Sequence, residues 1–296
     1  MRTRTTLAMG DTDVMSSACF SYSLFTEAAL ARTAFAPLVA REPEALSVVA
    51  SVTEGLVADP GRGVGPRWWA GSDAAGEIQA AFMHTPPRHL HIAFATPGQA
   101  RGLAALLADS PDTLPGVGGL REPAEAFADE WVSRTGATAT VSMEIGRFDL
   151  PVRSHVPFEV AGEFRVATTA DAPVLDEWHQ QFYEAIDGPG AQASPLDRHL
   201  ALGRVALWVH EGRPVSMAYA SPANGGITRI SGVWTPPELR GRGYASGVVA
   251  ALSAARQDAG ESCMLYTDLA NPTSNAIYQA MGYRRVGDNV DITFTA

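Results

Sequence analysis

A short stretch rich in glycine and arginine, near the C-terminus, is the part of the sequence best suited to hold a ligand. It follows a β-like segment that ends at Pro236-Pro237, since proline cannot continue a strand ladder, and it leads directly into a helix-like segment. Two glycines let the backbone approach an anion closely, and the start of a helix presents unpaired N–H groups with partial positive charge. The pattern predicts a diphosphate site formed by Arg240, Gly241, Arg242, Gly243, Tyr244, Ala245 and Ser246.

Two other phosphate-binding loops fit this stretch less well. A nucleoside triphosphate loop ends in Gly-Lys-Ser/Thr, whereas this one continues as Gly243-Tyr-Ala without a lysine. The dinucleotide fingerprint has the same strand–turn–helix context, and Asp268 would suit a ribose contact. Its third glycine position is Ser246, however, and fewer than thirty residues follow Asp268, too few for the rest of such a sheet. Both alternatives are therefore rejected.

The elements that must position this loop form a regular α/β pattern in the second half of the chain. Asp171–Ile186 is amphipathic and begins with an aspartate cap and Pro173, which predicts a helix. Glu211-Gly212 separates two strand-like runs and predicts a hairpin. The other elements expected are strands at 163–167, 205–210, 214–220, 226–235, 262–268 and 285–295, and helices at 245–259 and 272–281.

The first half shows a comparable alternation. Apolar residues at three- and four-residue spacing predict two helices within 26–56, separated by Pro43. Further expected elements are strands at 68–71, 78–82, 89–94 and 138–145, and helices at 98–107 and 122–135. Both halves run through helix, strands and two more helices, which hints at a duplication. The expected organisation is a flexible tail at 1–15, a domain at 16–150, a linker at 151–162 and a domain at 163–296.

Composition narrows the class of partner. The formal net charge of −10 argues against a nucleic-acid backbone or an anionic membrane. No apolar run is long enough for a membrane helix, and no signal-peptide pattern follows the N-terminus. The two cysteines, Cys19 and Cys263, have no metal-like spacing, so no metal site is expected and a reducing cytoplasm fits best.

The loop and a second motif together resemble one known family. Arg240, Gly243 and Ala245 match the three fixed places of the coenzyme A loop, Gln/Arg-x-x-Gly-x-Gly/Ala, of the GCN5-related N-acetyltransferases (GNAT family). The run from Asn271 through Tyr278 to Gly282-Tyr283 is similar to the closing signature of that family. The resemblance covers about 163–296. It implies an α/β fold with a central, mostly antiparallel sheet flanked by helices. It also suggests that the first half is a degenerate GNAT-like copy, because no intact loop follows Thr96.

The resemblance implies an N-acyltransferase that uses acetyl-CoA, or another acyl-CoA, as co-substrate and needs no metal. The acyl group would pass directly to an amine in a ternary complex. Strand 227–235 should part from strand 262–268 at its end, so that backbone groups of Val233, Trp234 and Thr235 pair with the pantetheine arm.

Two residues of the closing motif have expected roles. Tyr278 is the expected general acid for the departing thiolate, or else a core tyrosine. Asn271 precedes Pro272 and is suited to cap the last helix; the resemblance adds a contact to the cofactor arm, and the two roles are compatible.

The general base is left open, because strand 227–235 contains no acidic residue. Candidates are His179, Glu184, Asp187 and His210, each with a surface position as the ordinary interpretation. The missing carboxylate leaves one alternative function, a non-catalytic acyl-CoA sensor or scaffold.

The acceptor is expected to be a small-molecule amine or a protein or peptide amine, and the protein a monomer or homodimer. A vestigial pocket in the first half is considered near Trp68, Trp69 and His84.

Overall fold

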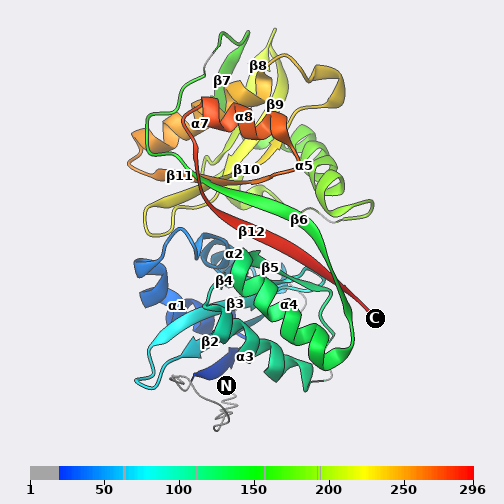
Figure 1. Ribbon diagram of the computed structural model, residues 1–296. Helices are drawn as coiled ribbons and strands as arrows, with labels where there is room; N and C mark the ends of the chain where they lie inside the picture. The colour runs from blue at the N-terminus through cyan, green and yellow to red at the C-terminus, as the bar shows by residue number, and fades with distance from the viewer. Residues whose placement is uncertain (1–19, 63–64, 111–112, 157, 192, 194) are drawn as a thin grey trace. The chain divides into compact units, whose positions relative to one another are not determined.

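The chain divides into two compact units. The computed structural model in Figure 1 describes residues 20–296 with the exception of 63–64, 111–112, 157, 192 and 194. Unit 1 comprises Met1–Gly146 and Gly287–Ala296, and unit 2 comprises Arg147–Val286. The expected tail at 1–15 and Cys19 lie outside the described residues.

Unit 1 alternates strands and helices throughout. Its strands are β1 (Ser21–Phe25), β2 (Arg67–Ser72), β3 (Ile78–His84), β4 (Leu90–Phe94), β5 (Gly116–Leu120) and most of β6 (Thr138–Asp149). Its helices are α1 (Ala28–Arg41), α2 (Ser47–Ala58), the 3₁₀ turn η1 (Pro60–Arg62), α3 (Pro97–Ala108) and α4 (Arg121–Thr135). The helices predicted on either side of Pro43 are confirmed as α1 and α2.

Unit 2 repeats this order. Its strands are β7 (Glu163–Val166), β8 (Val205–His210), β9 (Arg213–Ala220), β10 (Ile227–Trp234), β11 (Ser262–Asp268) and the start of β12 (Arg284–Thr295). Its helices are η2 (Thr169–Asp171), α5 (Ala172–Asp187), α6 (Asp197–Ala201), η3 (Pro237–Leu239), α7 (Tyr244–Asp258) and α8 (Pro272–Ala280). The predicted hairpin is confirmed, with left-handed backbone at Glu211 (φ 50°) and Gly212 (φ 73°).

The two halves share one sequence of elements, apart from short 3₁₀ turns: strand, two helices, three strands, helix, strand, helix, strand. This supports the expected duplication. Sequence patterns did not predict β1, β5 or α6. Strand β5 reads Gly-Val-Gly-Gly-Leu and has almost no strand propensity of its own, because glycine is unfavourable in strands.

In unit 1 the strands lie in the order β1-β2-β3-β4-β5-β12-β6. Neighbouring residues of β2 point to opposite faces, with Trp68 in the core under α1 and α2, and Trp69 in the core under α3 and α4. Among the pairs with a defined register, only β4 and β5 run parallel. A mostly antiparallel sheet flanked by helices is therefore confirmed for this unit.

Unit 2 has the matching arrangement, in the order β6-β11-β10-β9-β8-β7. Its parallel pair is β10 and β11, the equivalent of β4 and β5. Helices α7 and α8 cover the face that contains Trp208, and α5 and α6 cover the face that contains Leu207. No helix in the described part of the chain is long and apolar enough to cross a membrane.

The last strands of the two halves change places. Strand β12 pairs with β5 of unit 1 from Asn289 to Thr293, and β6 continues beside β11 of unit 2, where the Leu150 amide donates to the Cys263 carbonyl at 3.0 Å. Gly287–Ala296 consequently belongs with unit 1, whereas the sequence assigned the whole of 163–296 to the second domain. Strand periodicity cannot reveal this, because it does not specify which sheet a strand joins.

The glycines of β5 are required by this packing. Gly119 has φ +130°, which side chains rarely adopt, and a Cβ there would lie 2.1 Å from the backbone oxygen of Ile92. A Cβ on Gly118 would lie within van der Waals overlap of the Asp291 carboxylate. Positions 118 and 119 of β5 thus have no room for a side chain where β4 and β12 approach them.

We predict that Gly119→Ala destabilises the protein by about 3 kcal/mol, because backbone strain and a backbone clash coincide. Gly136→Ala is the control: Gly136 also has positive φ (+75°), but its Cβ would meet nothing within 4 Å, so about 1 kcal/mol is expected. Urea denaturation of both variants measures the difference. Equal losses of stability in the two variants would mean that β4 leaves room for a side chain at position 119.

Candidate functional site

The beginning of α7 is an uncapped helix start. Its N-cap residue is Gly243, which has no side chain to accept from the first amides. Gly241 and Gly243 both have left-handed backbone, at φ +77° and +80°. Within the described residues, the amides of 241–246 have no hydrogen-bond acceptor. Arg240, Gly241 and Arg242 are exposed, so an anion could reach these amides from solvent.

At the start of α3, the equivalent helix of unit 1, side chains of the first turn cap the backbone amides. Only two residues separate β4 from α3, and Pro97 occupies the first turn. The Thr96 hydroxyl accepts from the Gln99 amide at 3.3 Å, and Gln99 Oε1 accepts from the Thr96 amide at 2.7 Å. A capping box therefore satisfies the Thr96 and Gln99 amides, whereas the equivalent amides of Gly243 and Ser246 have no acceptor among the described residues. This contrast supports the expected degeneracy of the first half.

Strands β10 and β11 separate toward α7. Their parallel pairing runs from Ile227 with Ser262 to Ile230 with Leu265 and, in the described part of the chain, goes no further. The pairing of β10 with β9 shifts between Ser231 and Trp234, which marks a β-bulge around Gly232 (φ +59°). The parting predicted from the sequence is present.

The end of β10 is held by side chains that the sequence did not indicate. The Trp234 indole donates to Gln181 of α5 at 3.1 Å. The Ser216 hydroxyl lies 3.0 Å from the Trp234 carbonyl oxygen and 2.9 Å from Thr235 Oγ1. These contacts join residues far apart in the sequence, so no local signal could reveal them. The glycine inside a strand pattern at 232 was the available sign of a bulge.

Arg240 turns back toward this strand end. Its guanidinium stacks over the Trp234 ring at 4.9 Å, and its Nε donates to the Thr235 carbonyl at 3.0 Å. The Trp234 and Thr235 carbonyls thus already accept bonds, although each oxygen can accept a second one. Arg240 links the loop to the strand, whereas exposed Arg242 projects charge to solvent.

Tyr278 lies in α8 and is partly buried against the unit 2 core. Its ring centroid is 6.0 Å from that of Tyr283. Burial raises the pKa of Tyr278 to about 12, and its hydroxyl has no hydrogen-bond partner among the described residues. The Tyr283 hydroxyl, in contrast, lies 2.8 Å from Ser253 Oγ in the core. Of these two tyrosines, Tyr278 alone has an uncommitted hydroxyl.

Asn271 caps α8 as the sequence predicted. Its Oδ1 accepts from the Ser274 amide at 3.1 Å, and its carbonyl accepts from the Asn275 amide. The side-chain NH₂ of Asn271 has no partner in the part of the chain that the structure describes. The cap and a contact to a cofactor arm therefore remain compatible.

The candidate bases occupy different environments. His179 is 3% exposed and lies among aromatic rings, so its expected surface position is wrong; the amphipathic face of α5 packs it against β9. Glu184 is exposed and accepts from Gln180. His210 is partly buried beside the Tyr244 ring. The Asp187 side chain lies outside the described residues.

The described residues contain no group of three or more side chains that could hold a metal ion. Cys263 is buried in β11, and burial raises its thiol pKa to about 12. It would therefore be protonated at neutral pH, which makes it a poor nucleophile.

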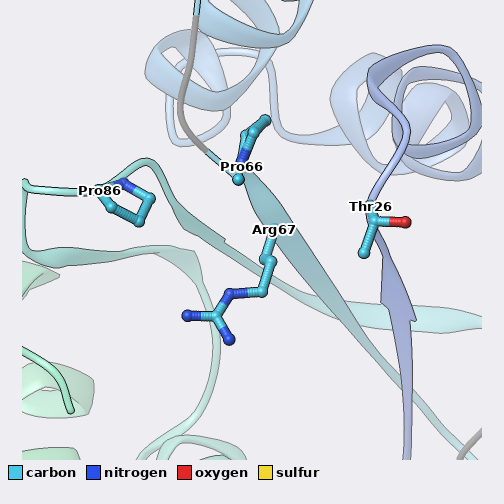
Figure 2. Close-up of a pocket in the computed structure, with 5 residues that line it drawn as sticks. Thr26, Pro66, Arg67 and Pro86 are labelled. Carbon is cyan, nitrogen blue, oxygen red and sulfur yellow. The ribbon is translucent and has the colours of Figure 1, made fainter. Parts of the chain in front are cut away.

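Unit 1 has a cavity of about 440 Å³ that is lined by Thr26, Gly65, Pro66, Arg67 and Pro86 (Figure 2). These residues lie where β1 ends, β2 begins and β3 ends, which is the sheet end at which β4 starts. Helix α3 follows the opposite end of β4. The cavity is therefore remote from the place equivalent to the α7 loop. Trp68, Trp69 and His84 are buried and are not among its lining residues.

Comparison with known proteins agrees with this geometry. Residues 209–291 match a protein-family model described as FR47-like protein. No curated protein gives a significant sequence match.

Solved structures extend the likeness to both halves. A GCN5-related N-acetyltransferase from Sphaerobacter thermophilus has a TM-score of 0.60 and 15% identity over 92% of this chain and 95% of its own. A GCN5-related N-acetyltransferase from Kribbella flavida has a TM-score of 0.53 and 19% identity, over 90% of this chain and 95% of its own. A tandem GNAT protein from the clavulanic acid biosynthesis pathway has a TM-score of 0.53 and 12% identity, over 93% of this chain and 98% of its own. The chain has the fold of the GCN5-related N-acetyltransferases, and it has this fold in tandem.

Asn271 offers a test that separates its two roles. We predict that Asn271→Ala loses about 1 kcal/mol of stability, because the Ser274 amide loses its acceptor. Asn271→Asp keeps the acceptor and should retain stability, but it lacks the NH₂ donor and should bind coenzyme A more weakly than wild type. Denaturation and calorimetry measure the two effects. Unchanged affinity in Asn271→Asp would limit Asn271 to capping.

Proposed function

We propose that the protein is an N-acyltransferase that transfers an acyl group, expected to be acetyl, from coenzyme A to the amine of a small molecule or peptide, in the cytoplasm. One observation carries the proposal: α7 begins with open amides, two left-handed glycines and exposed arginines, whereas α3 at the equivalent place is capped. A diphosphate is the part of coenzyme A that suits such a helix start.

The cofactor arm would follow the diphosphate toward the sheet. Beyond Ile230 and Leu265 the two parallel strands no longer pair, so β10 has backbone groups available to an added strand-like ligand. In this proposal Val233, which follows Gly232 within the bulge, donates its amide to the thioester carbonyl. Trp234 and Thr235 extend the same edge.

The reaction would be a direct displacement. The unprotonated amine attacks the thioester carbonyl carbon, a C–N bond forms and the C–S bond breaks. The thiolate takes a proton from the Tyr278 hydroxyl, and the nitrogen releases its extra proton to a base or to water, through which Tyr278 is protonated again. The high pKa of Cys263 agrees with a route without a covalent enzyme intermediate.

Because the pKa of Tyr278 is raised, the thiolate that leaves must also have a raised pKa if it is to take the tyrosine proton. A solvated thiol has a pKa of about 8.5, so a phenol with a pKa of about 12 would be a weak donor to it. The surroundings that raise the pKa of Tyr278 would also raise the pKa of a thiol expelled beside it, so that the thiolate could accept this proton.

The proton of the amine has no carboxylate on β10 to accept it. His210 and Glu184 are partly buried and exposed, respectively, and both stay candidates. An acceptor amine with a low pKa would need no strong base. The absence of a carboxylate on β10 also keeps a non-catalytic acyl-CoA sensor or scaffold as the alternative function.

We predict that Gly241→Val reduces the affinity for acetyl-CoA by about tenfold or more, because a side chain would block the approach to the amides. A Cβ at Gly241 meets nothing within 4 Å, whereas one at Gly243 would lie 2.7 Å from Phe158, so Gly241 is the cleaner test. Gly260→Val is the control, at the other end of the same helix with φ +81° and equally open space.

Isothermal titration calorimetry measures this affinity. Normal binding by Gly241→Val, or no binding by the wild type, would contradict the placement of the diphosphate.

We predict that Tyr278→Phe lowers turnover by about 10²-fold while changing coenzyme A affinity little, because only the proton donor is lost. Release of free thiol from acetyl-CoA, with a panel of amines, measures turnover. An unchanged rate would remove the acid role. Binding without thiol release for any amine would favour the sensor.

A further inference from the structure

The bulge in β10 is built around a ring from the neighbouring strand. Gly232 is buried and left-handed, and a Cβ there would lie 2.0 Å from Cε1 and 3.1 Å from Cζ of Tyr219. Tyr219 belongs to β9 and is paired with Ser231 in register. Its ring therefore occupies the volume that a side chain on the bulge would need.

Two histidines on different helices hold this ring. His179 of α5 contacts Tyr219 edge-to-face, with centroids 5.4 Å apart and planes at 90°. His199 of α6 lies 4.9 Å from it at 56°. His179 is itself buried against Tyr183, at 4.9 Å. Because both helices pack on this face of the sheet, Tyr219 cannot swing away from Gly232 without disturbing them.

The position of the ring determines the direction of the next peptide. The amide of Val233 follows Gly232 directly, so its orientation depends on the φ and ψ angles of the bulge. A bulge re-aims the backbone, and a bulge without support would be free to relax toward a regular strand. A preorganised donor contributes to catalysis only if it stays aimed at the place where charge develops.

We propose that Tyr219, clamped by His179 and His199, is a positioning residue that fixes the β10 bulge and aims the Val233 amide at the thioester carbonyl. The inference rests on the proposed function. It assigns no proton transfer to Tyr219 and gives the positioning role to the shape of the ring.

The test observes the thioester itself and needs no acceptor. Acetyl-CoA labelled with ¹³C at the carbonyl is bound to the protein, and isotope-edited infrared spectroscopy records the carbonyl stretch. A hydrogen bond from Val233 lowers this frequency relative to free acetyl-CoA. Tyr219→Phe keeps the ring and should keep the lowered frequency. Tyr219→Leu removes the ring and should return the frequency toward the free value, with acetyl-CoA affinity within about threefold of wild type.

Two further variants exclude general destabilisation. Tyr22→Leu makes the same change in the core of unit 1 and should leave the frequency lowered. His199→Ala removes one side of the clamp at a partly buried position and should give an intermediate frequency; it decides the test if Tyr219→Leu does not fold.

A wild-type frequency in Tyr219→Leu, or in His199→Ala where that variant decides, would overturn the proposal. So would bound acetyl-CoA in the wild type with an unshifted carbonyl. If the wild type does not bind acetyl-CoA, the proposed function is contradicted, and this inference is contradicted with it.

Discussion

The open amides at the start of α7 are the feature on which the interpretation of this protein depends. A helix leaves its first N–H groups without intrahelical partners, and side chains, water or a bound ligand can supply the missing acceptors. Here the cap position is Gly243, which offers none, and the preceding turn is exposed. A helix start of this kind is stabilised when an anion binds to it, so the amides that lack partners are also the groups that the proposed diphosphate would contact.

The tandem fold provides an internal comparison for that feature. Helices α3 and α7 begin at equivalent places, because each connects the two strands of its unit's parallel pair. Thr96 and Gln99 close the first, and Gly243 leaves the second open. Because the surrounding elements follow the same order, the difference in capping can be traced to a few residues of one turn. The shared order of elements does not determine whether the helix start is capped or open.

Sequence patterns predicted the features that depend on neighbouring residues. The α7 loop, the cap at Asn271 and the Glu211-Gly212 hairpin all follow from local backbone preferences. Patterns did not predict β5, whose glycines reflect the close approach of other strands, or the contact of Tyr219 with Gly232. They also placed His179 on the surface. Such features depend on which distant segments meet, and this is not encoded in the periodicity of one segment.

The exchange of terminal strands makes each half structurally dependent on the other. Strand β6 is made by the first half but borders β11 in the second, and β12 is made by the second half but borders β5 in the first (Figure 1). A gene shortened to the segment that resembles an acetyltransferase would leave β11 without β6 on one side, and β12 without β5 to pair with. The second half therefore depends on backbone supplied by the first, even where the first half binds no ligand of its own.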